Sequence, residues 1–179
     1  MSCGGGILSD DLKTEIINTS QSQEGLHFYA DLRNKYNFAP KKSQSASATM
    51  AQLFLQQKLA MQLSGRWLVP KYRESAFFDW DIINFPKGNI GSIVPMDTSG
   101  WSIYKNTKNK DLAIKFVQYL SSKENIEKMT QSGLITPARI DVANSESFLN
   151  GKPNSSKIFL DVIKTSKPTP VSKNYRELT

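Results

Sequence analysis

The chain has 179 residues, of which 39% are hydrophobic and 22% are charged, and its formal net charge is +7 at pH 7. A chain of this length can bury a core without disulfides or a structural metal, and its composition is that of an ordinary folded protein. With one cysteine it cannot form an internal disulfide and has too few thiols for a metal site, so we expect no metal and no cofactor.

The N-terminal third of the chain predicts two helices. In SQSQEGLHFYADLRNKYNFAP, residues 20–40, Ser20 and Gln23 have the spacing of a capping box, and apolar residues recur at helical intervals. We expect this helix to pack an aromatic stripe on a core, formed by Phe28, Tyr29 and Tyr36. A loop over residues 41–49 then leads into a second helix, ASATMAQLFLQQK, residues 46–58.

The middle of the chain predicts short extended segments. LAMQL, residues 59–63, is an apolar run of strand length that ends before Gly65. FFDWDIINFP, residues 77–86, alternates, and Phe78, Trp80 and Ile82 share one side, which favours core packing for Trp80. Two further β-type runs follow, at residues 87–95 and 99–105.

The last third of the chain predicts helices again. Residues 109–122 have an amphipathic pattern that begins at Asn109 as N-cap. A capping box of Ser121 and Glu124 opens the next helix, and Gly133 ends it. A short helix, a turn at Gly151 to Pro153, another helix and an extended end complete the chain. Strands and helices interleave, which favours α/β architecture.

Several motifs in this order carry a family resemblance. They are Phe54-Leu55-Gln56-Gln57-Lys58, Ala60-Met61, Gly65-Arg66-Trp67, Trp80-Asp81, Pro86-Lys87-Gly88, Asn109-Lys110-Asp111-Leu112-Ala113, and Gly133 with Pro137-Ala138-Arg139. Together they resemble the central-to-C-terminal region of bacterial extracellular solute-binding proteins of carbohydrate ABC transporters, the maltose-binding-protein-like group. One departure is Gln57, which stands where that family usually has glycine.

The resemblance implies an α/β fold of the type II periplasmic-binding-protein kind, in the form of an incomplete lobe with chain crossovers to the missing lobe. Residues 1–85 are expected to form part of the C-terminal-type lobe, and residues 86–133 to belong to or pack on the other lobe. Residues 134–179 are expected to return to the first lobe. The family's N-terminal half has no counterpart here, so the chain is expected to supply one wall of a ligand cleft.

By the same resemblance, the protein is the solute-binding component of an ABC-type importer. It would bind a sugar or oligosaccharide in an inter-lobe cleft and hand it to membrane permease subunits, as a monomer outside the cytoplasm, in the periplasm or as a cell-surface lipoprotein. Catalysis is not expected. The absence of phosphate-loop, dinucleotide-binding, HExxH, CxxC and GxSxG motifs also favours a binding protein over an enzyme.

Gly65, Arg66 and Trp67 form the first candidate binding motif. A sugar ring offers a face of C–H groups that packs on an aromatic side chain, and its hydroxyls need donors such as those of arginine. By resemblance, the tryptophan of a Gly-x-Trp motif lines the ligand cleft. The structural alternative is that Trp67 fastens the turn to the core while Arg66 points to solvent.

The resemblance places further cleft residues at Ser99, Gly100, Trp101 and Arg139. Glycine permits close approach, so Ser99 and Gly100 are expected to present backbone N–H groups to the ligand. Trp101 could instead pack between lobes, and Arg139 could instead pair with Asp141. The expected binding residues are therefore Trp67, Trp101, Arg139, Gly100, Ser99, Arg66 and Gly65.

Other functions stay open from the residues alone. The same receptor fold could take a polyamine or a glycerophosphate, and Asp79 and Asp81 beside Trp80 fit the polyamine. A small basic domain that binds nucleic acid or a protein is a second alternative, but the lysines are scattered, so we expect no nucleic-acid partner. A hydrolase would need two carboxylates that face each other across a substrate, which neighbours on one strand seldom supply.

Overall fold

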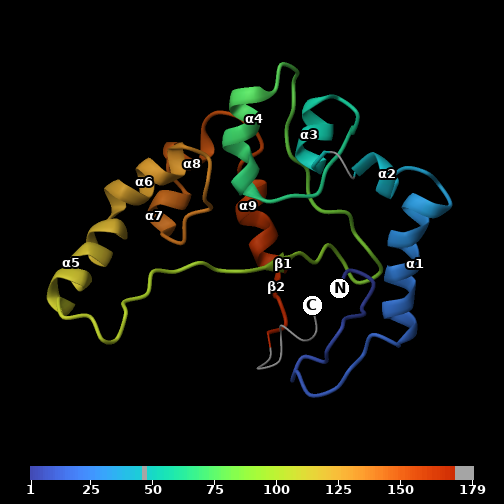
Figure 1. Ribbon diagram of the computed structural model, residues 1–179, viewed down its shortest axis with the longest axis horizontal. Coiled ribbons are helices and arrows are strands. Elements are labelled where there is room, and N and C mark those ends of the chain that lie inside the picture. The colour runs from blue at the N-terminus through green and yellow to red at the C-terminus, as the bar shows by residue number, and fades with distance from the viewer. Residues whose placement is uncertain (46–47, 172–179) are drawn as a thin grey trace. The chain divides into compact units, whose positions relative to one another are not determined.

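The computed structural model describes residues 1–45 and 48–171. Helices dominate these residues (Figure 1), and their one sheet has two short parallel strands, β1 (Pro95–Met96) and β2 (Lys167–Pro168). The chain divides into two compact units. Unit 1 comprises Met1–Leu53, Asn84–Asp97 and the part from Val162 onward, and unit 2 comprises Phe54–Ile83 and Thr98–Asp161. Within the described ranges, none of the helices has the length and apolar character needed to cross a membrane.

Unit 1 contains α1 (Ser20–Asn34), which begins one residue earlier than the capping box predicts, because Thr19 is the N-cap and accepts from the Ser22 N–H. The prediction that its aromatic stripe packs on a core is wrong. Phe28, Tyr29 and Tyr36 are exposed, and α1 has no buried residue. Tyr36 stacks on its neighbour Phe38 instead, with ring centroids 5.7 Å apart.

The region after α1 differs from the predicted loop and long helix. It contains a short helix, α2 (Lys42–Ser45), inside the predicted loop, and α3 (Met50–Leu55), which is shorter than the predicted helix over residues 46–58. Residues 46–47, where that helix was expected to start, lie outside the described residues. Gln57 ends the turn after α3 with φ of 57°. This left-handed conformation favours glycine, which accounts for the family's usual residue there.

Unit 2 is built around a small helical core. A 3₁₀ turn, η1 (Arg66–Leu68), runs directly into α4 (Val69–Ser75). The other helices of the unit are α5 (Lys110–Leu120), α6 (Lys123–Gln131), α7 (Ile140–Ala143), α8 (Glu146–Leu149) and α9 (Ile158–Asp161). The chain then continues as the 3₁₀ turn η2 (Val162–Thr165). Helices α6, α7 and α8 contact one another (Figure 1). The largest fully buried side chains among the described residues are those of Phe148, Val142, Thr130, Pro153 and Ser156.

The predicted strands over residues 59–63 and 99–105 are not formed. A strand needs a partner for its backbone hydrogen bonds, and the described residues supply none for either segment. Residues 77–86 are also outside any sheet, yet their predicted alternation is confirmed. Trp80 is buried and meets the Tyr72 ring edge-on with centroids 5.5 Å apart, while Asp79 and Asp81 are exposed.

The predicted ends of the C-terminal helices are close to those observed. Asn109 is the N-cap of α5, as predicted. The N-cap of α6 is Ser122, one residue after the predicted Ser121, and its side chain accepts from the Asn125 N–H at 3.4 Å. Gly133 follows α6 with φ of 88°, a left-handed conformation that confirms it as the stop.

Replacing Ser122 with alanine is expected to lower the free energy of unfolding by about 1 kcal/mol, because the N–H of Asn125 loses its acceptor. Urea unfolding followed by circular dichroism measures the loss. Ser121→Ala is the matched control and is expected to change stability by less than half as much, since the Ser121 side chain does not cap α6. Equal losses in the two variants would contradict the assignment of the cap.

The expected division at residues 85 and 133 concerns the two lobes of a complete receptor and stays a prediction. Within the chain itself the compact units divide elsewhere, after residues 53, 83, 97 and 161. All seven candidate binding residues lie in unit 2.

Candidate functional site

The candidate motif Gly65-Arg66-Trp67 lies at the start of η1 in unit 2. Gly65 is the N-cap in an extended conformation, with φ of −114° and ψ of 179°. In a 3₁₀ turn successive side chains point about 120° apart, so neighbours face different surroundings. Arg66 is accordingly turned inward and only 4% exposed, whereas Trp67 is turned outward and 66% exposed.

The indole of Trp67 lies over the backbone of Gly65. A methyl group added at Gly65 would lie 1.9 Å from Cζ3 and 2.4 Å from Cη2 of the indole, so any larger residue would collide with the ring. One side of the six-membered ring therefore rests on the glycine, and most of the side chain faces solvent. Trp67 does not fasten the turn to the core, which was the structural alternative.

The Arg66 side chain is buried in the core of unit 2. Its Cζ lies 4.1 Å from the ring centroid of Phe148 and 5.3 Å from that of Phe159. The three guanidinium nitrogens are buried and have no hydrogen-bond partner in the part of the chain that the structure describes. Burial, with a smaller contribution from the charge of Arg73, lowers the pKa of Arg66 to about 10. The expectation that Arg66 offers N–H donors at the surface is wrong, because its guanidinium is buried.

Hydrogen bonds hold the segments on both sides of the Gly65-Arg66-Trp67 motif. Tyr72 donates a hydrogen bond from Oη to Oε1 of Gln62 at 2.5 Å, which ties the segment before η1 to α4. Arg73 donates from Nε to the carbonyl of Lys152 at 2.5 Å and from Nη1 to the carbonyl of Gln131 at 2.8 Å. These hydrogen bonds hold the residues before and after η1 in place. The exposed indole of Trp67 therefore lies on a turn whose flanking segments are packed.

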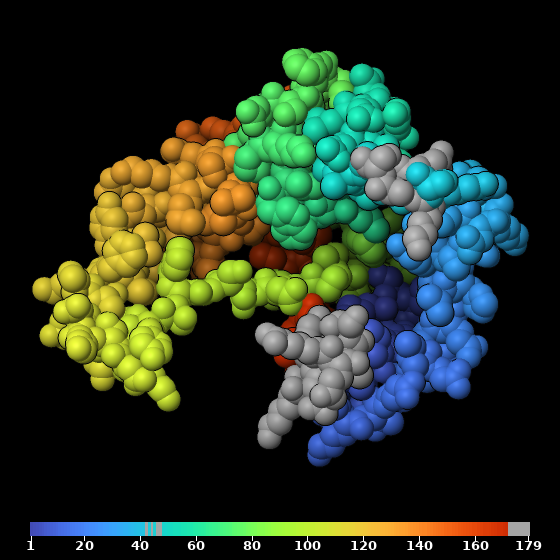
Figure 2. Space-filling model, in the orientation of Figure 1, coloured from blue at the N-terminus to red at the C-terminus, as the bar shows by residue number. Residues whose placement is uncertain are grey.

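Ser99, Gly100 and Trp101 lie on a segment whose residues 97–106 are all exposed (Figure 2). Trp101 is 57% exposed. A methyl group added at Gly100 would meet no atom within 4 Å, so nothing in the described chain requires glycine there. Among the described residues no ring contact joins Trp101 to Trp67.

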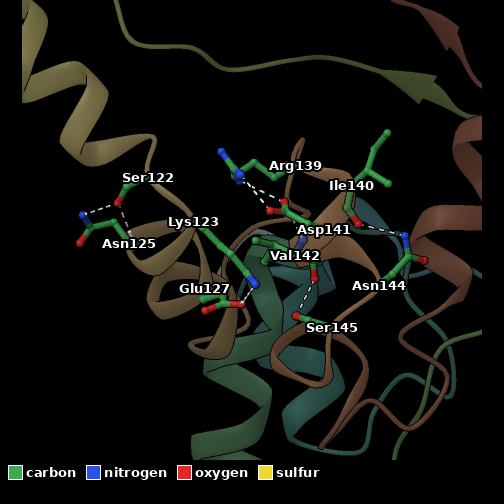
Figure 3. Close-up of polar contacts among 10 residues, drawn as sticks. All are labelled: Ser122, Lys123, Asn125, Glu127, Arg139, Ile140, Asp141, Val142, Asn144 and Ser145. Atoms are coloured by element: carbon green, nitrogen blue, oxygen red, sulfur yellow. Dashed lines mark hydrogen bonds and ion pairs between the residues drawn. The ribbon is translucent and has the colours of Figure 1, made fainter.

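Arg139 is held by Asp141, as Figure 3 shows. Its Nε donates to Oδ1 of Asp141 at 3.0 Å and its Nη2 donates to Oδ2 at 2.8 Å. These hydrogen bonds raise the pKa of Arg139 and hold the pKa of Asp141 below its usual value. The ion pair that competed with the binding role is therefore formed, and it uses two of the five N–H groups of the guanidinium.

The acidic residues beside Trp80 are also engaged. Asp79 forms an ion pair with Lys152. Asp81 accepts from the N–H of Ser155 at 3.0 Å and from its hydroxyl at 2.8 Å. Burial raises the pKa of Asp81, but the hydrogen bonds outweigh it, and the pKa is lowered overall. A polyamine site would need carboxylates beside an exposed aromatic ring, and here the ring is buried.

In residues 1–45 and 48–171, no three side chains of histidine, cysteine, aspartate or glutamate gather into a potential metal site.

The residues that support the candidate site were missed by sequence reasoning. Phe148 and Phe159 contact Arg66 from positions more than 80 residues away, and no local pattern connects such positions. Tyr72 and Gln62 are closer in sequence, but their side-chain hydrogen bond has no periodic signal either.

Among solved structures, the chain resembles an ABC substrate-binding protein from Listeria monocytogenes in complex with cycloalternan, with a TM-score of 0.82 at 20% sequence identity. The match covers 99% of this chain and 46% of that chain, so this chain spans less than half the length of its structural neighbour. The fold is that of an ABC-type substrate-binding protein, in the form of an incomplete type II lobe.

The family model described as bacterial extracellular solute-binding protein matches residues 1–152. The chain belongs to this family, whose members are extracellular, and this places the protein outside the cytoplasm. No curated protein matches the sequence significantly.

Proposed function

We propose that the chain is part of the solute-binding component of an ABC-type importer, and that the complete receptor binds a sugar or oligosaccharide in its inter-lobe cleft without catalysis. The observation that carries the proposal is the Trp67 indole, 66% exposed on a packed turn. Exposing a large aromatic ring on a fixed support provides a flat apolar surface that a ligand can cover.

The chemistry of a sugar suits this surface. The C–H face of the ring packs on the indole, and the hydroxyl groups at its edge need hydrogen-bond partners once water is excluded. Trp101 offers a second exposed ring, and Ser99 and Gly100 offer backbone N–H groups on an exposed segment. Arg139 keeps N–H groups that Asp141 does not use. The neighbour's complex with cycloalternan supports an oligosaccharide as the ligand class.

Transport follows from lobe closure. A ligand that contacts both walls of the cleft binds the closed state better and shifts the population toward it. The closed receptor, a monomer outside the cytoplasm, would then dock on the membrane permease subunits. No nucleic-acid partner and no cofactor is required.

Titration calorimetry on a complete receptor that contains this chain tests the proposal, with cycloalternan, malto-oligosaccharides, spermidine and glycerol 3-phosphate as separate probes. We expect an oligosaccharide to bind, and at 100 times its Kd to stabilise the receptor by about 2.7 kcal/mol. The 179-residue chain alone is expected to bind far more weakly, because one wall cannot desolvate the ligand. Binding of spermidine or glycerol 3-phosphate alone would contradict the sugar assignment.

A further inference from the structure

The side chain of Arg66 is buried in a way that its charge does not explain. It is 4% exposed, and none of its guanidinium nitrogens has a hydrogen-bond partner among the described residues. A buried charge without a hydrogen-bond partner is destabilising, and an apolar residue of similar volume is often as good or better at such a position. A ligand-contacting role does not explain it either, since the guanidinium is covered by protein.

The guanidinium lies over two aromatic rings. Its Cζ lies 4.1 Å from the Phe148 ring centroid and 5.3 Å from the Phe159 ring centroid, distances at which a guanidinium is attracted to an aromatic face. Arginine is planar and more weakly hydrated than lysine, so it can lie between rings where an ammonium group cannot. Arg66 is thereby fixed in the core of unit 2 by its shape.

Fixing Arg66 also fixes the residue that follows it. The two residues are adjacent in one 3₁₀ turn, so the backbone that directs Arg66 inward directs Trp67 outward. The indole then rests on Gly65 and makes no stacked ring pair with any described aromatic side chain. The direction of the indole therefore depends on the turn, and the turn depends on its buried arginine.

We propose that Arg66 is a positioning residue, which holds the Trp67 indole in its outward orientation by packing its guanidinium against Phe148 and Phe159. The consequence for ligand affinity rests on the proposed function, whereas the effect on the indole does not. The role depends on shape, so Arg66→Met, which keeps length and contact with aromatic rings, should preserve the orientation. Arg66→Lys keeps the charge, but its hydrated ammonium draws the side chain toward water and disturbs the turn.

The test uses the 179-residue chain labelled with 5-fluorotryptophan, without any ligand. Its three tryptophans give three fluorine resonances, and the Trp67 resonance is identified by its loss in Trp67→Phe. We expect this resonance to shift and narrow toward that of an unrestrained indole in Arg66→Ala and Arg66→Lys, and to stay near its native position in Arg66→Met. The resonance of buried Trp80 should be unchanged in all three variants and reports that the core is intact.

Three outcomes overturn the proposal. In the first, the Trp67 resonance is unchanged in every variant. In the second, the Trp67 and Trp80 resonances change together, also in Arg66→Met, which would make Arg66 a general core residue. In the third, Arg66→Lys preserves the orientation and Arg66→Met does not, which would make the charge decisive. None of these readouts depends on a sugar, so a receptor that binds another solute would leave the positioning role intact.

Discussion

Replacing Trp67 with alanine is expected to weaken oligosaccharide binding by the complete receptor at least about tenfold, which corresponds to about 1.4 kcal/mol. The variant removes the flat surface on which the sugar ring would pack, and most of the side chain's surface faces solvent rather than protein. Stability should change by less than about 0.5 kcal/mol, because the side chain is largely exposed and contributes little to the core. Calorimetry gives the affinity and thermal unfolding gives the stability.

Two further variants test whether the loss of affinity comes from the position of the Trp67 ring. Phe77→Ala removes another exposed aromatic side chain of unit 2, 98% exposed, and should leave affinity unchanged. Gly65→Ala keeps the indole but places a methyl group in the space that the ring occupies, so the ring must move and affinity should fall without loss of the tryptophan. Native affinity in Trp67→Ala would remove the central observation behind the proposed function.

Local features of unit 2 were predictable because they depend on neighbouring residues. The amphipathic pattern predicted the start of α5 at Asn109, although the Asn109 side chain makes no capping hydrogen bond there. Gly133 ends α6 through a backbone conformation that glycine adopts readily. The alternation around Trp80 likewise determined which side chains are buried, although the segment has no sheet partner. These predictions needed only the spacing and size of neighbouring side chains.

Features that depend on distant residues were not predictable. An apolar run such as residues 59–63 indicates a strand only if another strand lies beside it, and the described chain provides none. The aromatic stripe of α1 predicts burial only if a second element covers it, and here it is exposed. The burial of Arg66 was the least predictable feature. Its side chain packs on Phe148 and Phe159, which the local sequence around Arg66 does not reveal.

Replacing Phe148 with alanine is expected to be the most destabilising of these substitutions. Phe148 is 0% exposed, and truncating a buried phenylalanine costs about 3–5 kcal/mol through lost burial and the cavity left behind. The ring also covers the guanidinium of Arg66 at 4.1 Å, so the variant leaves a buried charge beside a cavity. Urea unfolding, followed by the fluorine resonance of Trp80, measures the loss in unit 2.

The cost of uncovering the Arg66 guanidinium can be measured separately from the cost of the cavity. If the guanidinium packs on the ring, Phe148→Ala should cost less in an Arg66→Met background, because no charge is then left uncovered, and a double-mutant cycle should show a coupling of about 0.5–3 kcal/mol. Phe148→Leu, which keeps most of the volume, should cost less than Phe148→Ala in both backgrounds. Additive losses would mean that the ring and the guanidinium do not support each other, and that Arg66 is held in the core by its aliphatic chain alone.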